Sequence, residues 1–520
     1  MKKLLVAPAV ATLLVGLAPS AGMGNVVRAA TPHKGGTLIA ARAADAVLWD
    51  PAQTNDNDSL WAQQQVLGTL VKVSGDGKSI SPGIASSWQV SKDGRIYTFH
   101  INPQAKFCDG TPITSADVVY SYMRESAKTS GVNWQFPGLV SVTPQGAQTV
   151  VVKLAQPSPA YISYVTLWGS AITSKAYGTK VGNAGLATGT LGSGAFCLAA
   201  WKKGQEIDLT RNTHYWLKDA QGTQLPYLDA ITWKIIPDDN ARVLALQSGQ
   251  VQVITPVPTG QFNMLKAYPN ITAGQSTLLG AAVLVTNVRK AALSDLKVRQ
   301  AMNYALDKNA IVKAVLFGHG QPAMDPIDLM NWNTPKYGYT YNLSKAKQLM
   351  AASKYPKGFT TSVNYPSGDS AAAQTLVIVK AQWAKIGIAL DIKPLDAGTL
   401  NGALNAATFD MVYGLGTGDI FDPSENLPYE MLPKSVGGQD AGHSGWTDPA
   451  LTKLVLAAVQ EMNVQKRIAM YQTIQKIFME TGPGIWLFNP QNLWATSNKI
   501  QGFTMYATAR QTFDTTWISQ

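Results

Sequence analysis

The sequence lacks the local patterns that mark most enzymes and metalloproteins. No GxSxG, HExxH or CxxC motif occurs, and the five histidines (His33, His100, His214, His319 and His443) are scattered. None of them lies three or four residues from a cysteine or from another histidine, as the ligands of a local zinc site do. Paired carboxylates for glycoside hydrolysis are defined by spatial position, so the sequence leaves that chemistry open. The pattern favours a protein that is not an enzyme and needs no cofactor or metal.

Cysteine and charge are also scarce. The 520 residues include only two cysteines, Cys108 and Cys197, and 14% are charged. Two cysteines in an oxidising compartment can pair, but the sequence does not show that their Cα atoms come close enough, so a disulfide is left open. The formal charge is +11 without any dense run of Lys and Arg. Nothing therefore indicates nucleic-acid binding.

Long apolar runs are confined to the N-terminus. Lys2 and Lys3 precede the apolar stretch Leu4–Ala18, which is too short to span a bilayer comfortably. Val27-Arg28-Ala29 places small or aliphatic residues at the −3 and −1 positions of a cleavage site, so residues 1–29 are expected to be a secretory signal peptide. Cleavage there leaves 40 basic and 32 acidic residues, a formal charge of +8. No cysteine ends the signal, so we expect a soluble, exported protein without a lipid anchor.

The rest of the chain predicts a mixed α/β fold. A chain of 520 residues is too long for one core, so two or three domains are expected. Ile96–Ile101 alternates like a half-buried strand, whereas Asp295 begins a helical pattern that runs through Leu306. Strand-like and helix-like segments alternate again over Val363–Phe488, which indicates a second α/β lobe.

The most informative stretch is Tyr413–Pro428, YGLGTGDIFDPSENLP. Phe409–Val412 before it predicts a short buried strand, and three glycines (Gly414, Gly416 and Gly418) let the backbone approach something closely. Asp419 then lies where the strand end opens into a loop, a common place for ligand contacts. One interpretation makes Asp419 an anionic anchor at the floor of a cleft. The other is that Asp419 only hydrogen-bonds its own turn.

Four segments together resemble family 5 of the bacterial extracellular solute-binding proteins, the peptide/nickel class that serves ABC importers. In chain order these are FCDGTPITSADVVYSYMR (Phe107–Arg124), GSGAFCLAAWKKGQEIDLTRNTHYW (Gly192–Trp216), LKVRQAMNYALDKNAIV (Leu296–Val312) and GTGDIFDP (Gly416–Pro423). The resemblance extends from about Gly35 to the C-terminus. It implies a periplasmic-binding-protein-like fold with two α/β ligand-binding lobes, a hinge and an inserted third domain.

The resemblance also implies domain bounds and partners. Lobe I would consist of residues 30–58, 186–287 and 487–520, lobe II of the insertion 59–185, and lobe III of residues 288–486. The ligand would lie between lobes I and III, which close on it by a hinge motion. The expected partners are the solute and the permease subunits of an ABC transporter in the inner membrane, and the protein is expected to be a periplasmic monomer.

Family site residues carry over onto matching positions of this chain. Asp419 matches the aspartate that pairs with the α-ammonium of the ligand in peptide-binding members, and the backbone of Gly416, Thr417 and Gly418 matches the segment that pairs with an extended peptide. The opposite side would be lined by Asn55, Asp56, Asn57 and Asp58. Trp134 and Trp446 lie in loop-like stretches and are further candidates for ligand contact, although most tryptophans are partly buried core residues.

Two departures from the family pattern bear on the ligand. Dipeptide-binding members carry a tryptophan where this chain has Gly416, and an arginine for the ligand carboxylate in the loop that is here Tyr365–Ser370, YPSGDS. We therefore predict a roomier site without that carboxylate clamp, for a peptide or another amine-bearing solute. Receptors for an oligosaccharide, an opine, or a nickel or haem complex remain open, as do an exported hydrolase and an envelope protein that binds no small ligand.

Overall fold

The computed structural model describes residues 31–54, 56–325, 336–438 and 443–520. The expected signal segment 1–29 and the candidate Asn55 lie outside these residues. Residues 33–520 form one folded unit. Among the described helices, none is both long and apolar enough to cross a membrane.

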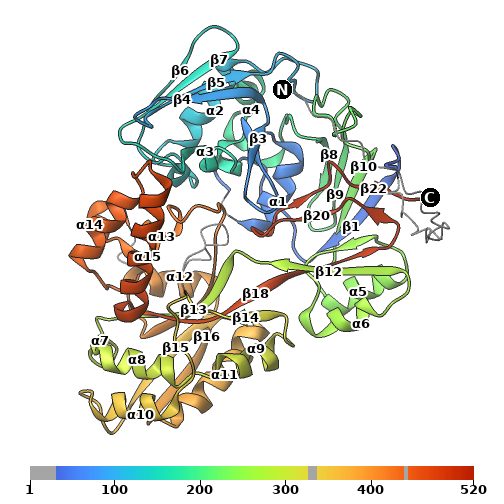
Figure 1. Ribbon diagram of the computed structural model, residues 1–520. Helices are drawn as coiled ribbons and strands as arrows, with labels where there is room; N and C mark the ends of the chain where they lie inside the picture. Colours follow the sequence, from blue (N-terminus) through green and yellow to red (C-terminus); the bar gives the residue numbers. More distant parts are fainter. Residues whose placement is uncertain (1–30, 55, 326–335, 439–442) are drawn as a thin grey trace, which may run out of the picture. The chain divides into compact units, whose positions relative to one another are not determined.

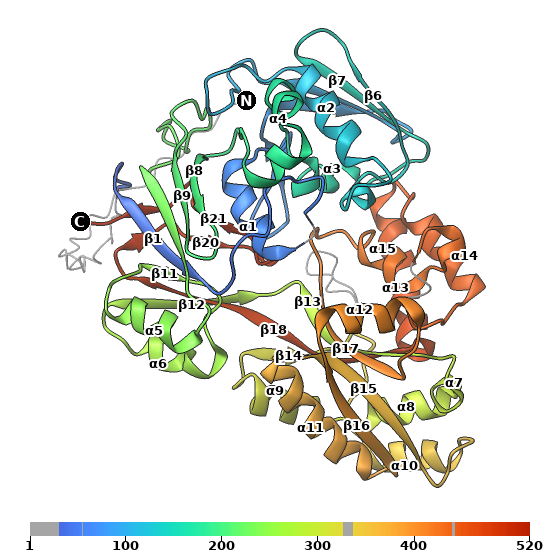
Figure 2. The same cartoon turned by 180° about the vertical axis from the view of Figure 1, so that it is seen from behind.

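One long mixed sheet runs through the folded unit (Figures 1 and 2). Its main path is ordered β16-β15-β17-β13-β18-β11-β1-β10-β9-β8, and β12 and β14 also pair with β18. The strands are β1 (Thr37–Arg42), β8 (Phe196–Lys202), β9 (Glu206–Arg211), β10 (Ala230–Ile235), β11 (Val253–Ile254), β12 (Ile271–Thr277), β13 (Gly280–Thr286), β14 (Gly320–Pro322), β15 (Phe359–Pro366), β16 (Ile388–Leu395), β17 (Met411–Thr417) and β18 (Gly484–Ser497).

Strand β18 connects the two halves of this sheet. Its first residues, Gly484–Phe488, pair with β13, and Gln491–Ser497 pair with β12. Strands β12 and β13, which are consecutive in the chain, both pair with β18 and run alongside it. Two extended segments, β18 and β12–β13, therefore connect the half of the sheet with β15–β17 to the half with β1 and β8–β11.

A separate antiparallel sheet has the order β4-β5-β7-β6. In β5, Tyr97, Phe99 and Ile101 are buried, as the alternation in the sequence predicts. The strands of this sheet are β4 (Ala85–Val90), β5 (Ile96–Ile101), β6 (Leu139–Pro144) and β7 (Thr149–Leu154). Three short pairs are β2 (Val71–Val73) with β3 (Ile80–Pro82), β19 (Ile500–Gln501) with β22 (Trp517–Ile518), and β20 (Thr504–Met505) with β21 (Gln511–Thr512).

The helices begin where polar caps stand in the sequence. Asp295, Asp307, Asp369 and Asp448 each accept a backbone N–H from the first turn of the helix that follows. The α-helices are α1 (Asn57–Val66), α2 (Ser115–Glu125), α3 (Tyr161–Tyr164), α4 (Lys175–Thr188), α5 (Asp239–Gln247), α6 (Phe262–Lys266), α7 (Ala291–Ser294), α8 (Leu296–Tyr304), α9 (Lys308–Val315), α10 (Leu343–Ala351), α11 (Ser370–Ala384), α12 (Ala397–Ala406), α13 (Asn426–Met431), α14 (Pro449–Ala458) and α15 (Val464–Thr481). Short 3₁₀ turns are η1 (Asn133–Gln135), η2 (Trp168–Ser170), η3 (Thr259–Gln261) and η4 (Lys434–Val436).

Three large apolar clusters form the interior. One packs α8–α11 against the half of the long sheet that contains β15 and β17, with Trp383 fully buried and its Nε1–H donating to the carbonyl of Met302 at 2.9 Å. A second lies under β1 and β8–β10, and a third under the antiparallel sheet and α2. This is the mixed α/β arrangement that the alternating pattern predicts, whereas the domain bounds given above stay predictions.

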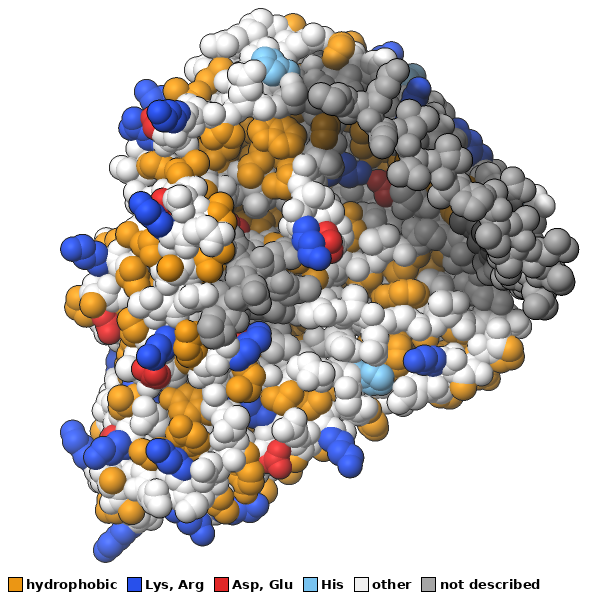
Figure 3. Space-filling view, in the orientation of Figure 1, with side chains coloured by type: hydrophobic (Ala, Val, Ile, Leu, Met, Phe, Trp, Pro, Cys, Tyr) orange, Lys and Arg blue, Asp and Glu red, His pale blue; other side chains and the backbone are white. Residues whose placement is uncertain are grey.

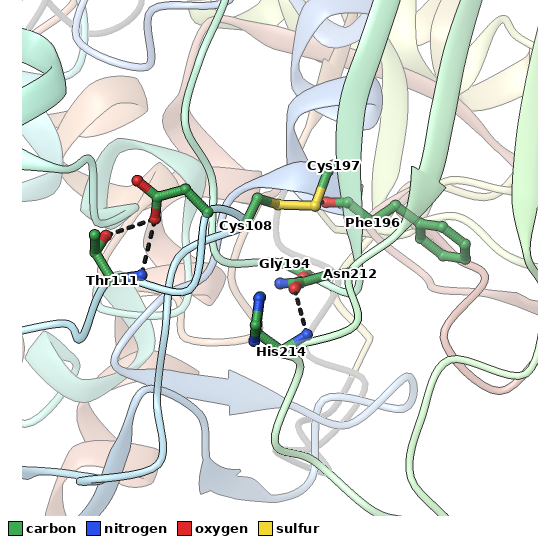
Figure 4. Close-up of a disulfide and its surroundings, with 8 residues drawn as sticks. Cys108, Thr111, Gly194, Phe196, Cys197, Asn212 and His214 are labelled. Atoms are coloured by element: carbon green, nitrogen blue, oxygen red, sulfur yellow. Dashed lines mark hydrogen bonds between the residues drawn. A yellow bond between two sulfur atoms is a disulfide. The ribbon is translucent and has the colours of Figure 1, made fainter.

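Cys108 and Cys197 are joined in a disulfide, the alternative that the sequence left open (Figure 4). Cys108 lies in the turn before α2, and Cys197 lies in β8, 89 positions further along the chain. Next to the bridge, the N–H of Cys108 donates to the carbonyl of Gly192 at 2.9 Å. The disulfide therefore ties the segment that leads into α2 to the last strand of the long sheet.

Removing this cross-link should lower stability. The Cys108→Ser/Cys197→Ser variant is expected to lose about 2–4 kcal/mol of unfolding free energy, because a bridge that closes a long loop restricts the unfolded chain. Urea unfolding followed by tryptophan fluorescence measures the difference. Thiol counting on the denatured, unreduced wild type should find no free thiol; two free thiols per chain would contradict the pairing.

Candidate functional site

The glycine-rich stretch before Asp419 is part of a strand. The sequence pattern predicts a strand that ends at Val412, but β17 continues to Thr417. Its backbone pairs with β13 over the whole length, with Gly416 opposite Ala281. Glycine lacks a side chain for packing, but it keeps the backbone N–H and C=O groups. These groups form the hydrogen bonds with β13, so the strand can continue through the glycines.

The other edge of β17 is largely unpaired. It pairs with β15 only at Met411 and Val412. In the part of the chain that the structure describes, no strand pairs with this edge from Tyr413 to Thr417. A Cβ atom on Gly414 would meet no atom within 4 Å, and one on Gly416 would meet only the carbonyl oxygen of Ala281 at 3.9 Å. The strand thus offers a bare edge, and the face of the sheet is open above its glycines.

The loop after β17 is organised by Glu425. The Glu425 carboxylate accepts the N–H of Asp419 and the N–H of Ile420, each at 2.8 Å. Just before them, the N–H of Gly418 donates to the carbonyl of Leu279 at 2.8 Å, and a Cβ on Gly418 would lie 2.9 Å from the Leu279 side chain. Glu425 therefore binds the amides of the turn, a role that the second interpretation above gave to the side chain of Asp419.

The carboxyl groups of Asp419 and Glu425 interact in a half-enclosed setting. Burial raises the pKa of Asp419 from 3.8 to about 6, with Glu425 and the Arg510 guanidinium opposing that rise. Burial, followed by the Asp419 charge, raises the pKa of Glu425 well above its usual range. The charge on Asp419 thus disfavours ionisation of Glu425, and the two carboxyl groups titrate as a linked pair.

The same loop packs against three distant parts of the chain. Ile420 belongs to an apolar cluster with Leu60 of α1 and with Tyr164 and Trp168. The hydroxyl of Tyr164 donates to the carbonyl of Ser424 at 3.1 Å. The ring of Phe421 covers the turn between β2 and β3 so closely that a Cβ on Gly77 would lie 2.0 Å from it. These contacts fix the backbone on the C-terminal side of Asp419.

The acidic candidates at the start of α1 have partners within the protein. Helix α1 begins at Asn57, where the Asp56 side chain accepts the N–H of Ser59 at 2.8 Å and caps the helix. Asp58 forms an ion pair with the buried Arg42 at 3.0 Å, and Asn57 is exposed. A role of Asp56, Asn57 and Asp58 in ligand binding stays a prediction.

The two candidate tryptophans lie in different environments. Trp134 is 36% exposed and meets Tyr164 and Trp168 edge to face, at ring-centroid distances of 6.3 and 6.0 Å. It therefore borders the cluster that holds Ile420. Trp446 is only 9% exposed and packs edge to face on Phe478 in the apolar cluster around α14 and α15. The structure thus brings Trp134, and not Trp446, to the loop that carries Asp419.

Two charged residues near Asp419 were missed by sequence reasoning. Glu425 is present in the stretch Tyr413–Pro428, but no pattern there indicates that it binds the turn. Arg510 is near the other end of the chain and affects the pKa of Asp419. Elsewhere, on the face shown in Figure 3, Lys and Arg side chains are dispersed among uncharged ones. In the residues that the structure places, no group of three or more His, Cys, Asp or Glu could hold a metal ion.

Comparison with known proteins gives the family. The model of the bacterial extracellular solute-binding proteins, family 5 Middle, matches residues 79–436. The chain belongs to this family. The probable D,D-dipeptide-binding periplasmic protein DdpA of Escherichia coli K12 is 26% identical over 504 residues, which cover 95% of this chain and 96% of DdpA.

Two solved structures of similar proteins share the whole fold. The periplasmic binding protein DppA from Helicobacter pylori in complex with the peptide STSA has a TM-score of 0.81 at 25% identity, covering 94% of this chain and 99% of that one. AgaA from A. tumefaciens R10 in complex with agropinic acid has a TM-score of 0.80 at 25% identity, covering 93% and 99%. The α/β binding-protein fold expected from the sequence is therefore confirmed.

Family 5 membership also gives the broad function. The chain is a solute-binding protein of the kind that serves ABC importers, and the family consists of binding proteins, not enzymes. Both statements confirm what the sequence predicts.

The pH dependence of stability tests the account of Asp419. Because its pKa is raised from 3.8 to about 6, the stability that protonated Asp419 contributes is complete below pH 3.8 and is lost as pH rises through 6. Asp419→Asn cannot ionise, so it should be more stable than the wild type at pH 7.5, by up to about 3 kcal/mol for a pKa raised from 3.8 to about 6, and similar at pH 4. Urea unfolding at pH 4, 6 and 7.5 measures this. An Asn variant that is less stable at every pH would show that Asp419 is a structural residue of the turn.

Proposed function

We propose that this family 5 protein is a periplasmic receptor that binds a peptide or another amine-bearing solute and delivers it to an ABC permease. The observation that carries the proposal is the division of roles between Glu425 and Asp419. Glu425 accepts the backbone N–H groups of the loop. The Asp419 side chain accepts neither of these amides, so its carboxylate can meet a ligand amine, in a setting where burial makes a carboxylate without a positively charged partner costly.

The strand next to Asp419 supports a peptide-like ligand. The edge of β17 from Tyr413 to Thr417 has no strand partner within the described residues. The face of the sheet at Gly414 and Gly416 is open as well, because these residues have no side chain. An extended chain placed there would gain backbone hydrogen bonds by strand addition, while its amino group reaches Asp419. Among similar proteins, DdpA is named for D,D-dipeptides and DppA was solved with the peptide STSA.

An opine is the second candidate. AgaA, which is 25% identical and has the same fold, was solved with agropinic acid. Open space beside Gly414 and Gly416 also suits a compact solute that forms no strand. An oligosaccharide provides no positive charge for Asp419 unless it carries an amine, and nickel or haem complexes offer a metal ion and not an ammonium group, so the site gives these ligands less support.

The anchor role predicts the effect of one substitution. Asp419→Asn should weaken binding of a free-amine peptide more than tenfold, about 1.4 kcal/mol, because a charge-assisted hydrogen bond becomes a neutral one. Isothermal titration calorimetry measures the affinity after a thermal-shift screen of peptides of two to six residues, octopine and oligosaccharides has found a binder. Asp391→Asn is the matched control, since Asp391 is an exposed carboxylate on β16 that pairs with Lys393 at 3.4 Å.

Acetylated peptides separate the alternatives in the same screen. A thermal shift with free-amine peptides that disappears on N-acetylation supports the proposal. Equal shifts for both forms would reject an ammonium anchor. A shift with oligosaccharides alone would keep the transport role and overturn this account of the ligand.

A further inference from the structure

The net charge of the chain is concentrated in one segment. Residues 288–400 include 14 basic and 7 acidic residues, a formal charge of +7, whereas residues 30–520 together carry +8. Ten of those basic residues and two of the acidic ones belong to α8–α11 and the turns that adjoin them. These helices cover one face of the half of the long sheet that holds β15–β17 (Figures 1 and 2). The sequence has no dense run of Lys and Arg, so the fold is what gathers this charge.

Helices α8 and α10 bring lysines together at one end of this half. The Nζ of Lys297, in the first turn of α8, donates to the carbonyl of Ala352, directly after α10, at 2.9 Å. The Asp295 side chain accepts the N–H of Lys297 at 2.9 Å and the N–H of Lys354 at 2.8 Å. The beginning of α8 and the end of α10 therefore lie side by side.

The same end of the sheet continues onto α11. Strands β15 and β16 begin there as a parallel pair, with Phe359 opposite Ile388. Lys357 lies two residues before β15, and Lys385 lies at the end of α11, three residues before β16. We call this surface the lysine end and define it by five exposed lysines, Lys297, Lys354, Lys357, Lys380 and Lys385.

The charges of the lysine end are not compensated by ion pairs. Among the described residues, no carboxylate forms an ion pair with any of the five lysines, whereas Lys393 nearby on β16 pairs with Asp391. The two carboxylates of α8–α11 and their turns serve as helix caps. Asp295 binds backbone N–H groups at α8, and Asp307 accepts the N–H of Ala310 at α9. The surface therefore keeps a positive charge.

Lysine, and not arginine, supplies this charge. Arg299, the arginine of α8, is 5% exposed and donates to the carbonyls of Leu293 and Thr481 inside the protein. Protein–protein interfaces are enriched in arginine and depleted in lysine, because the planar guanidinium makes fixed bidentate contacts and the flexible ammonium does not. Flexible ammonium groups spread over three helix ends suit a diffuse layer of negative charge, such as anionic lipid head groups.

Apolar side chains are exposed among these lysines. Val377 is 61% exposed and lies three residues, about one helical turn, before Lys380 on α11. Leu296 is 36% exposed and precedes Lys297. Such side chains and the aliphatic stems of lysine can enter the head-group region of a bilayer while the ammonium groups stay near the phosphates. The mixture favours a lipid surface over a polyanion in solution.

The lysine end and the candidate site lie at opposite ends of parallel strands. Strands β15, β16 and β17 run in the same direction. The first two begin at the lysine end, and β17 ends at the loop that carries Asp419. A surface that contacts the lysine end therefore leaves the bare edge of β17 and this loop accessible to a solute.

We propose that the lysine end binds the surface of a membrane that contains anionic lipids. The binding is electrostatic and reversible, and it holds the receptor close to the membrane in which an ABC permease would lie. It does not depend on the solute, so it can fail while the proposed function stands, and the reverse also holds.

Vesicle co-sedimentation tests this binding. The wild type is mixed with vesicles of equal parts phosphatidylglycerol and phosphatidylcholine, and separately with vesicles of phosphatidylcholine alone. The partition coefficient should be about tenfold or more higher for the anionic vesicles in about 50 mM NaCl, and the difference should shrink in about 200 mM NaCl because salt screens the attraction.

Three variants locate the binding on the lysine end. Glutamine at Lys354, Lys357, Lys380 and Lys385 together should lower the partition coefficient for anionic vesicles about fivefold or more, whereas arginine at the same four positions should retain it. The matched control replaces Lys92, Lys128, Lys153 and Lys180 with glutamine, which removes the same charge from exposed lysines outside the lysine end. This control should bind like the wild type.

Three results would overturn the proposal. One is equal partitioning of the wild type into both kinds of vesicle, which is also the result expected if the partner of the lysine end is an acidic protein. Another is an equal loss in the two glutamine variants, which would assign the binding to net charge and not to this surface. The third is a loss in the arginine variant as large as that in the glutamine variant, because the positive charge is then not what binds.

Discussion

The candidate site depends on the hydrogen bonds between the Glu425 carboxylate and the amides of Asp419 and Ile420. This side chain closes the turn after β17, and burial together with the Asp419 charge raises its pKa. If Glu425 were absent, Asp419 would be the nearest side chain able to cap those amides, and its charge would be used within the protein. The turn thus separates a structural carboxyl group from one that can meet a solute.

Packing gives this turn its fixed position. Ile420, Phe421 and Ser424 contact α1, the β2–β3 turn and α3, three elements far apart in the sequence. Apolar burial and the hydrogen bond from the Tyr164 hydroxyl hold the loop in position from several sides. The strand that leads into it is itself anchored along β13, whose neighbour β18 extends into the other half of the sheet. Any hinge motion between the halves would therefore move the loop as part of a strand.

The sequence predicts those features that depend on interactions between residues close together in the chain, and misses those that depend on distant residues. A cap such as Asp295 acts within three residues, so the helix that it begins could be predicted, and so could the α/β alternation. The cap at Asp56 is equally local, but the family resemblance placed Asp56 in a segment that lines the ligand. The end of β17 was misplaced because its pairing with β13 is non-local. Arg510 could not be found at all, since its relation to Asp419 joins residues almost a hundred positions apart.

The carboxyl group of Asp419 narrows the range of solutes further than the shape of the site does. Burial raises the pKa of Asp419 to about 6, so its ionised form is costly unless a positively charged group lies beside it. A neutral sugar that displaced water from this carboxylate would leave its charge poorly solvated, a cost that hydroxyl groups offset only in part. A solute with an ammonium group compensates that charge. The same carboxyl group therefore favours one class of ligand and disfavours another, which is how a roomy site can remain selective.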